Sequence, residues 1–405
     1  MQTANTPKTS MYRNPFRPGA GHLPPYLAGR SAEQEEMRKL LSQETITDNA
    51  VITGLRGVGK TVLLESLKPI ALESGWLWAG TDLSESACIS EDAIAMRLLV
   101  DTAAAASSVL FEQAQHQKIG YLGDSEVQRF PLSYETLESM YRATPGLVSD
   151  KLKHVLEQIW KLLKNTEVRG IVFAYDEAQN LSDHKQEAQY PLSALLEVFQ
   201  SLQRKGIPFM LLFVGLPTLF PKLVEARTYA ERMFHVMTLS RLDEAASREA
   251  ILRPVEGHPI QFGENSVNTI VTVSGGYPYF LQYICKEVYD LWIAKVTANE
   301  TPTIPIENII RKLDSDFFQG RWSQTTDRQK DLLRAVVALD SCDDEFTGME
   351  VSNKSKELPI KPFSPSHVIQ MLNTLSDRGL VFRNRFGKYS LAVPLLSNFI
   401  RRQYD

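Results

Sequence analysis

The stretch Gly54-Leu55-Arg56-Gly57-Val58-Gly59-Lys60-Thr61 decides the fold of this 405-residue chain. A glycine, four free positions and then glycine, lysine and threonine form the pattern of a phosphate-binding loop. The glycines let the backbone turn tightly and bring its N–H groups against phosphate oxygens, where a Cβ would hold the ligand away. The sequence therefore predicts that this loop binds the phosphates of a nucleoside triphosphate.

The residues on both sides of the loop fit the strand and helix that it needs. Residues 49–53 form an apolar run typical of a buried strand, and a helix starting near Gly59 would point its positive dipole end at the phosphates. Lys60 is expected to neutralise the β- and γ-phosphates, and Thr61 to place its hydroxyl on Mg²⁺. A glycine-rich turn without this context would be a chance match. The nucleotide-binding residues predicted here are Gly54, Arg56, Gly57, Val58, Gly59, Lys60, Thr61 and Val62.

A second apolar run, 171–175, ends in two acids, Asp176 and Glu177. Carboxylate oxygens suit a hard cation, so Asp176 is expected to hold Mg²⁺ together with Thr61. Glu177 lies one residue further and is expected to orient or deprotonate the water that attacks the γ-phosphate. Two acids after a strand could also be a solvated turn. Downstream of the phosphate loop, they favour an ATPase that uses ATP and Mg²⁺.

Composition and length limit the class of protein. A chain of 405 residues should hold two or three domains, because a single core rarely grows past about 250 to 300 residues. The three cysteines lie far apart and in no metal-ligand spacing, so we expect reduced thiols in a cytoplasmic protein. We expect no signal peptide and no membrane span, because the longest apolar stretch, 207–220, is interrupted by a glycine and prolines.

Apolar runs alternate with helical segments over the first 240 residues, which predicts a three-layer α/β core with a parallel sheet. Residues 90–165 are expected to be a helical insertion, and residues 243–320 to be wholly helical. Residues 1–25 hold five prolines and predict an extended arm. The last segment should contain a helix at 326–339 and a second helix that begins at 364–366. A two-stranded stretch is expected after them, at 382–391. The strands are predicted at 49–53, 76–81, 170–175, 208–214 and 234–239.

These motifs together resemble the AAA+ class of P-loop ATPases, and two further elements sharpen the match. Tyr26-Leu27-Ala28-Gly29-Arg30 is similar to the amino-terminal motif that lines the adenine pocket in that class. Gly276-Tyr277-Pro278 is similar to the glycine-any-proline element of the signal-transducing STAND branch, where it replaces the lid arginine called sensor 2. The resemblance implies that Ala28, Gly29, Arg30 and Pro278 bind the nucleotide. Tyr279 and Phe280 are better read as helix core.

The layout is similar to origin-recognition-type initiators and to STAND-like ATPases of bacteria and archaea. That resemblance implies an AAA+ core with strand order 5-1-4-3-2 and ATP bound between core and lid. The implied domains are an arm at 1–25, an ATPase core at 26–242, an all-helical lid at 243–320 and a winged-helix domain at 321–405.

The class commonly uses an arginine from a neighbouring subunit to stabilise the transferred phosphoryl group. Arg232 is the candidate, Arg227 lies nearby, and a surface arginine capping a helix end is the plain alternative. Such an arginine implies a homo-oligomer. The polar residue expected at the end of the fourth strand, sensor 1, is replaced by Val214-Gly215-Leu216-Pro217-Thr218. This departure predicts slow hydrolysis, as in a switch rather than a motor.

The carboxy-terminal end is the one basic block that we consider for nucleic-acid binding. Residues 356–405 hold eight Lys or Arg against three Asp or Glu, although the whole chain carries a formal charge of −4. Residues 366–378 are the candidate recognition helix for double-stranded DNA, with Arg383, Arg385 and Lys388 in the wing. The alternative is a signalling or defence ATPase that acts on a partner protein and uses the winged helix as an internal lock. A scaffold that binds ATP without hydrolysing it is opposed by Glu177.

Overall fold

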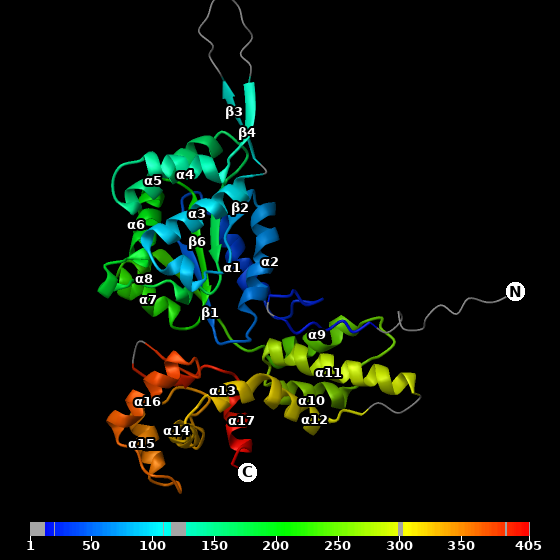
Figure 1. Ribbon diagram of the computed structural model, residues 1–405. Coiled ribbons are helices and arrows are strands. Elements are labelled where there is room, and N and C mark those ends of the chain that lie inside the picture. The colour runs from blue at the N-terminus through cyan, green and yellow to red at the C-terminus, as the bar shows by residue number, and fades with distance from the viewer. Residues whose placement is uncertain are drawn as a thin grey trace, which may run out of the picture. The chain divides into compact units, whose positions relative to one another are not determined.

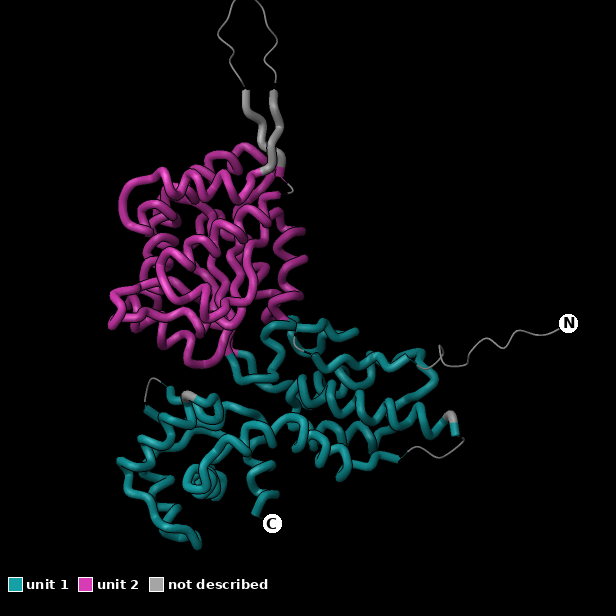
Figure 2. Tube along the Cα trace, in the orientation of Figure 1, with its two compact units in different colours: residues 1–31, 54–62, 239–405 teal, residues 32–53, 63–238 magenta. Residues whose placement is uncertain are grey.

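The chain divides into two compact units in the computed structural model (Figure 2). One unit contains residues 32–53 and 63–238, and the other contains residues 1–31, 54–62 and 239–405. The structure describes residues 13–19, 21–107, 109–114, 127–298, 303–384 and 387–404. Each unit has its own hydrophobic core.

The unit of residues 32–53 and 63–238 is built on a five-stranded sheet of order β2-β5-β6-β1-β7. The β2–β5, β5–β6 and β6–β1 pairs are parallel. Numbered along the chain within this sheet, the order is 2-3-4-1-5, which confirms the predicted 5-1-4-3-2. The strands are β1 Asn49–Gly54, β2 Trp76–Ala79, β5 Gly170–Tyr175, β6 Phe209–Gly215 and β7 Phe234–Leu239.

Helices cover both faces of the sheet, with α2 on one side and α5 and α6 on the other (Figure 1). Every residue of β1, β5 and β6 is therefore buried, which explains their unbroken apolar runs. This arrangement confirms the predicted three-layer α/β core. The helices are α1 Ser31–Leu41, α2 Lys60–Glu73, α3 Glu91–Ala106, α4 Tyr134–Ala143, α5 Val148–Leu163, α6 Pro191–Arg204, α7 Leu219–Ala226 and α8 Ala230–Met233.

The segment 90–165 differs from the prediction of helices alone. Its helices α3, α4 and α5 are interrupted by an antiparallel hairpin of β3 Leu110–Ala114 and β4 Val127–Pro131. Each strand has only five residues, so the helical periodicity of its neighbours dominates any sequence window that includes it. Residues 115–126 lie outside the described part of the chain.

A buried amide fixes the start of β1, the strand that leads into the phosphate loop. The Asn49 side chain is fully buried, and its Oδ1 accepts hydrogen bonds from the Leu211 backbone N–H and from Gln203 Nε2, both at 2.8 Å. Its Nδ2 donates to the Met233 carbonyl at 3.2 Å. Asn49 thus joins β1 to β6 and to the chain just before β7. The sequence offered no signal for this role.

The second unit is helical over the described residues 243–298 and 303–323, as predicted. Beyond them lie three helices, an antiparallel pair of short strands and a final helix, close to the predicted positions. Two of these helices, α15 and α17, were not predicted. The elements are α9 Glu244–Leu252, α10 Glu264–Ser274, α11 Pro278–Thr297, α12 Ile306–Leu313, α13 Gln319–Ser323, α14 Asp327–Val337, α15 Gly348–Ser355, α16 Pro365–Asp377, β8 Val381–Arg383, β9 Tyr389–Leu391 and α17 Leu396–Arg402.

One hydrophobic core runs through both helices α9 to α13 and the carboxy-terminal elements of this unit. The ring of Phe318 stacks on that of Phe399 with centroids 5.1 Å apart, and Trp322 meets Phe399 edge-on at 5.8 Å. The amino-terminal arm joins the same core through Phe16, which is 2% exposed. No helix among the described residues is long and apolar enough to cross a bilayer.

Candidate functional site

The phosphate loop has a backbone that only glycine adopts easily. Gly57 and Gly59 have φ of +77° and +91°, in the region that L side chains rarely occupy. A Cβ at Gly54 would lie 2.5 Å from the Leu239 carbonyl oxygen. The loop between β1 and α2 therefore has the strand, turn and helix context that the motif predicts.

Lys60 folds back over the loop from the first turn of α2. Its Nζ donates to the carbonyl oxygens of Gly54 and Leu55 at 3.0 and 2.9 Å. An ammonium held by two neutral carbonyls would gain by exchanging them for charged phosphate oxygens, because charge-assisted hydrogen bonds are stronger. Thr61 and Val62 follow in the same turn, and both are half-buried.

Arg30 braces the phosphate loop from the amino-terminal motif. Its guanidinium is 5% exposed and donates from Nη2 to the carbonyls of Val58 and Ser240, at 2.9 and 2.7 Å. Ala28 is buried, and Gly29 has a φ of +62°. The structure thus places the motif predicted to line the adenine pocket directly against the loop backbone.

Pro278 also lies beside the phosphate loop. It is the first residue of α11, a position where proline costs no hydrogen bond. The next backbone N–H, that of Tyr279, donates to the Gly57 carbonyl at 3.2 Å. A Cβ at Gly59 would lie 3.9 Å from the Pro278 ring. The ring of Phe280 is buried among Phe317 and Phe318, in agreement with its expected core role.

The two acids lie where β5 ends. Asp176 is 4% exposed, and its Oδ1 accepts from the Glu177 N–H at 2.7 Å. Backbone bonds from Asp176 N–H to the Thr81 carbonyl and from Leu83 N–H to the Asp176 carbonyl hold it in place. Glu177 is exposed and has a left-handed backbone, with φ of +51°. A non-glycine residue in this conformation costs about 1 to 3 kcal/mol and is most frequent at functional sites.

Sheet topology relates the acids to the phosphate loop. Thr53 of β1 pairs with Gly215 of β6, and Tyr175 of β5 pairs with Phe213 of β6. The carboxyl ends of these parallel strands therefore meet at one edge of the sheet. The phosphate loop follows β1 in the chain, and Asp176 and Glu177 follow β5. This edge is where open α/β sheets bind their ligands.

The two candidate arginines lie before β7, Arg227 just after α7 and Arg232 within α8. Arg232 is exposed in α8, and among the described residues the structure shows no ion pair for its side chain. Arg227 follows α7 and pairs with Glu197 at 3.4 Å. Arg232 is therefore more available to another molecule than Arg227 is.

Most basic residues predicted to contact DNA have partners within their own unit. Arg378 donates to the Gln324 carbonyl and to Gln329 Oε1, and Lys388 pairs with Glu345 at 3.4 Å. The exposed positions of α16 carry no Lys or Arg among its described residues. Arg383 lies over the Tyr389 ring, and Arg385 is outside the described part of the chain.

The phosphate loop also approaches the carboxy-terminal elements within its own unit. A Cβ at Gly379, between α16 and β8, would lie 3.5 Å from Arg56 Nη2. Burial and the nearby Arg56 guanidinium lower the pKa of Arg321 in α13. Arg56, predicted to bind nucleotide, thus also lies close to Gly379.

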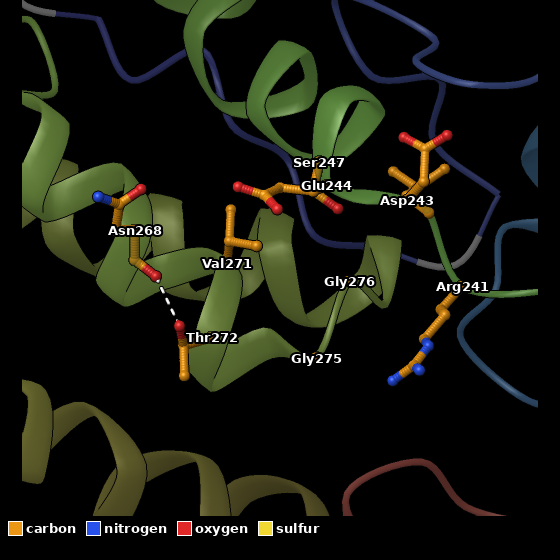
Figure 3. A pocket seen from close by; sticks show the side chains of 10 residues that line it. Arg241, Asp243, Glu244, Ser247, Asn268, Val271, Thr272, Gly275 and Gly276 are labelled. Carbon is orange, nitrogen blue, oxygen red and sulfur yellow. Dashed lines mark hydrogen bonds between the residues drawn. The ribbon is translucent and has the colours of Figure 1, made fainter.

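A pocket of about 620 Å³ that the sequence did not predict lies among α9, α10 and the start of α11 (Figure 3). Glu244 and Asn268 line it, and Arg241 lies across the pocket from Asn268. Two adjacent acids, Asp243 and Glu244, line this pocket together with Arg241, and their negative charges disfavour a triphosphate there. No periodic signal marks these lining residues.

Comparison with known proteins agrees with this geometry. A family model described as the AAA ATPase domain matches residues 26–209, which include the phosphate loop and both acids. This match confirms the predicted resemblance to AAA ATPases for that segment. No curated protein shows a significant sequence match to the chain.

Two solved structures share the fold. The ORC2 protein of Aeropyrum pernix in its ADP form aligns with a TM-score of 0.56 at 14% identity, over 95% of this chain and 97% of that one. The Walker-type ATPase of Pyrococcus abyssi aligns with a TM-score of 0.52 at 14% identity, over 93% and 96%. The chain therefore has the architecture of these two proteins.

Proposed function

We propose that this protein binds ATP, hydrolyses it slowly and acts as a nucleotide-dependent switch. The observation that carries the proposal is the sheet edge, where the glycine loop with Lys60 follows one strand and the acids Asp176 and Glu177 follow another. Backbone N–H groups, one ammonium and two carboxylates are the groups that phosphoryl transfer requires.

The donor set around the site suits Mg²⁺. Asp176 offers a carboxylate that accepts one backbone hydrogen bond, from the Glu177 N–H, and two further bonds hold the Asp176 main chain; Thr61 offers a hydroxyl in the first turn of α2. Hard cations prefer such oxygen ligands. When bound, Mg²⁺ supplies positive charge to the β- and γ-phosphate oxygens. Lys60 and the N–H groups of the loop would share that charge and orient the phosphates.

Glu177 is the proposed general base. Its carboxylate is exposed and would accept the proton of the attacking water, while Asp176, the residue before it, is buried. A base of this kind contributes about 10²- to 10⁴-fold to the rate. The missing polar side chain at the end of β6 supports slow turnover.

Steady-state ATP turnover of the full chain tests this proposal. Glu177→Gln and Lys60→Ala should each lower kcat at least about 100-fold. Glu307→Gln, a change at an exposed position of α12 far along the sequence from both motifs, is the matched control and should turn over ATP like the wild type. Equal and measurable rates in all four proteins would mean that the site is assigned wrongly. A scaffold that binds ATP without hydrolysis predicts no turnover in any of them.

Arg232 is proposed to act on ATP held by a neighbouring copy of the chain. Its exposure and lack of an ion pair among the described residues support this role. Light scattering with and without ATP should show a nucleotide-dependent assembly, and Arg232→Ala should lower kcat only under assembling conditions. A monomer in both states would contradict the role.

Two outputs of the switch are proposed. The first is association with double-stranded DNA through a winged helix at 321–405, supported by the basic excess at 356–405 and by the order of helices and paired strands. The second is an internal lock that a partner protein releases. The shared core of lid and carboxy-terminal elements, the proximity of Arg56 to Gly379 and the internal partners of Arg378 and Lys388 favour this second output.

A further inference from the structure

The side chain of Gln179 connects Glu177 to the end of β6. Its Nε2 donates to Glu177 Oε2, and its Oε1 accepts from the Leu216 backbone N–H at 3.0 Å. A carboxylate can only accept and a backbone N–H can only donate, so these two partners fix which end of the amide faces each. Of the uncharged side chains, an amide is suited to serve both at once.

The backbone of Gln179 is held as firmly as its side chain. Its carbonyl accepts a hydrogen bond from Lys222 Nζ at 2.8 Å, and burial lowers the pKa of that lysine. It lies in the short 3-10 helix η3 Ala178–Asn180, which directly follows Glu177. Helix α7 therefore anchors the segment that carries the amide.

Gly215 leaves room for this contact at the end of β6. A Cβ there would lie 2.5 Å from Gln179 Oε1 and 3.3 Å from the Gln179 nitrogen. The end of β6 has no polar side chain at Val214-Gly215-Leu216, which by itself predicts a weakened site. The Gln179 amide, which follows β5 in the chain, supplies a polar group at this position instead.

We infer that Gln179 is a positioning residue for Glu177, and that it supplies the polar link between the catalytic carboxylate and the β6 end. The inference rests on the proposed function, since it gives Gln179 a role only if Glu177 acts on ATP. The amide restrains a carboxylate that is otherwise exposed and would sample many rotamers. An error of about 1 Å in placing a catalytic group can lower the rate about 100-fold.

Two substitutions separate the contacts of this side chain. Gln179→Met keeps its length and loses both hydrogen bonds, whereas Gln179→Glu keeps an acceptor for Leu216, loses the donor to Glu177 and places a like charge beside that carboxylate. Both should lower kcat about tenfold or more, with the dissociation constant for ATP within about twofold of wild type. Asn180→Ala, the control, breaks the neighbouring bond to the Leu83 carbonyl and should leave kcat within about twofold. Thermal unfolding of each variant checks that the fold is kept.

A double-mutant cycle with Glu177→Gln completes the test. Gln179→Met combined with Glu177→Gln should be no slower than Glu177→Gln alone, because a positioning residue has nothing left to position. Fully additive losses, or wild-type kcat in Gln179→Glu, would overturn the inference while a slow Glu177→Gln leaves the proposed function standing. Wild-type turnover in Glu177→Gln would overturn both.

Discussion

Single residues fix the backbone conformation of the phosphate loop in the absence of a ligand. Arg30 does so most directly, because it is buried and satisfies two backbone carbonyls on different segments. We predict that Arg30→Met, which keeps the aliphatic stem, lowers the free energy of unfolding by about 2 to 4 kcal/mol and weakens ATP binding at least about tenfold. Titration calorimetry and denaturant unfolding measure the two effects. Arg253→Met, an exposed arginine of the same unit, is the control and should change stability by less than about 0.5 kcal/mol.

Sequence reasoning was strongest for residues that belong to a motif. It located the glycine loop, both acids and the strands that carry them, because buried parallel strands and glycine turns leave local signals. It could not find Arg30 bonded to the loop backbone or Gln179 bonded to Glu177, since those contacts depend on tertiary structure. A polar residue that follows a strand has no periodicity to distinguish it from a surface residue.

The predicted phosphate loop and acids follow strands β1 and β5 in the chain, β6 lies between these two strands in the sheet, and the Asn49 network sets the position of β1. We predict that Asn49→Ala destabilises the protein by about 3 kcal/mol, because the Leu211 N–H and Met233 carbonyl lose partners inside the core. Urea unfolding would measure this change, with the exposed Asn165→Ala as the control. A loss below about 1 kcal/mol would show that the network contributes little.

The short hairpin β3–β4, unlike strands β1, β5 and β6, was not predicted from the sequence. Two strands of five residues each, set among three amphipathic helices, give too weak an alternation to be predicted. The same limit applies to α15 and α17, whose helices of eight and seven residues are shorter than a reliable helical pattern.

At the scale of the whole molecule, the open question is whether the carboxy-terminal elements bind DNA or hold the ATPase inactive. If they bind DNA, the full chain should bind a duplex at 50 mM salt and lose most of that affinity at 200 mM, because phosphate contacts release counterions. If they are an internal lock, Arg56→Ala should raise kcat severalfold at saturating ATP, and DNA should not bind at either salt concentration. Fluorescence anisotropy of a labelled duplex and ATP turnover, measured on the same preparations, decide between the two. A duplex affinity that is the same at both salt concentrations would contradict association with DNA as the output of the switch.

The most direct test of the account is the affinity of the purified 405-residue chain for ATP in excess Mg²⁺. Calorimetry should give saturable binding of one ATP per chain in the wild type and a loss of at least about tenfold in Lys60→Ala, whose ammonium no longer meets the phosphates. Absence of measurable binding in the wild type, or equal affinity in both proteins, would contradict the assignment of the glycine loop as the phosphate site.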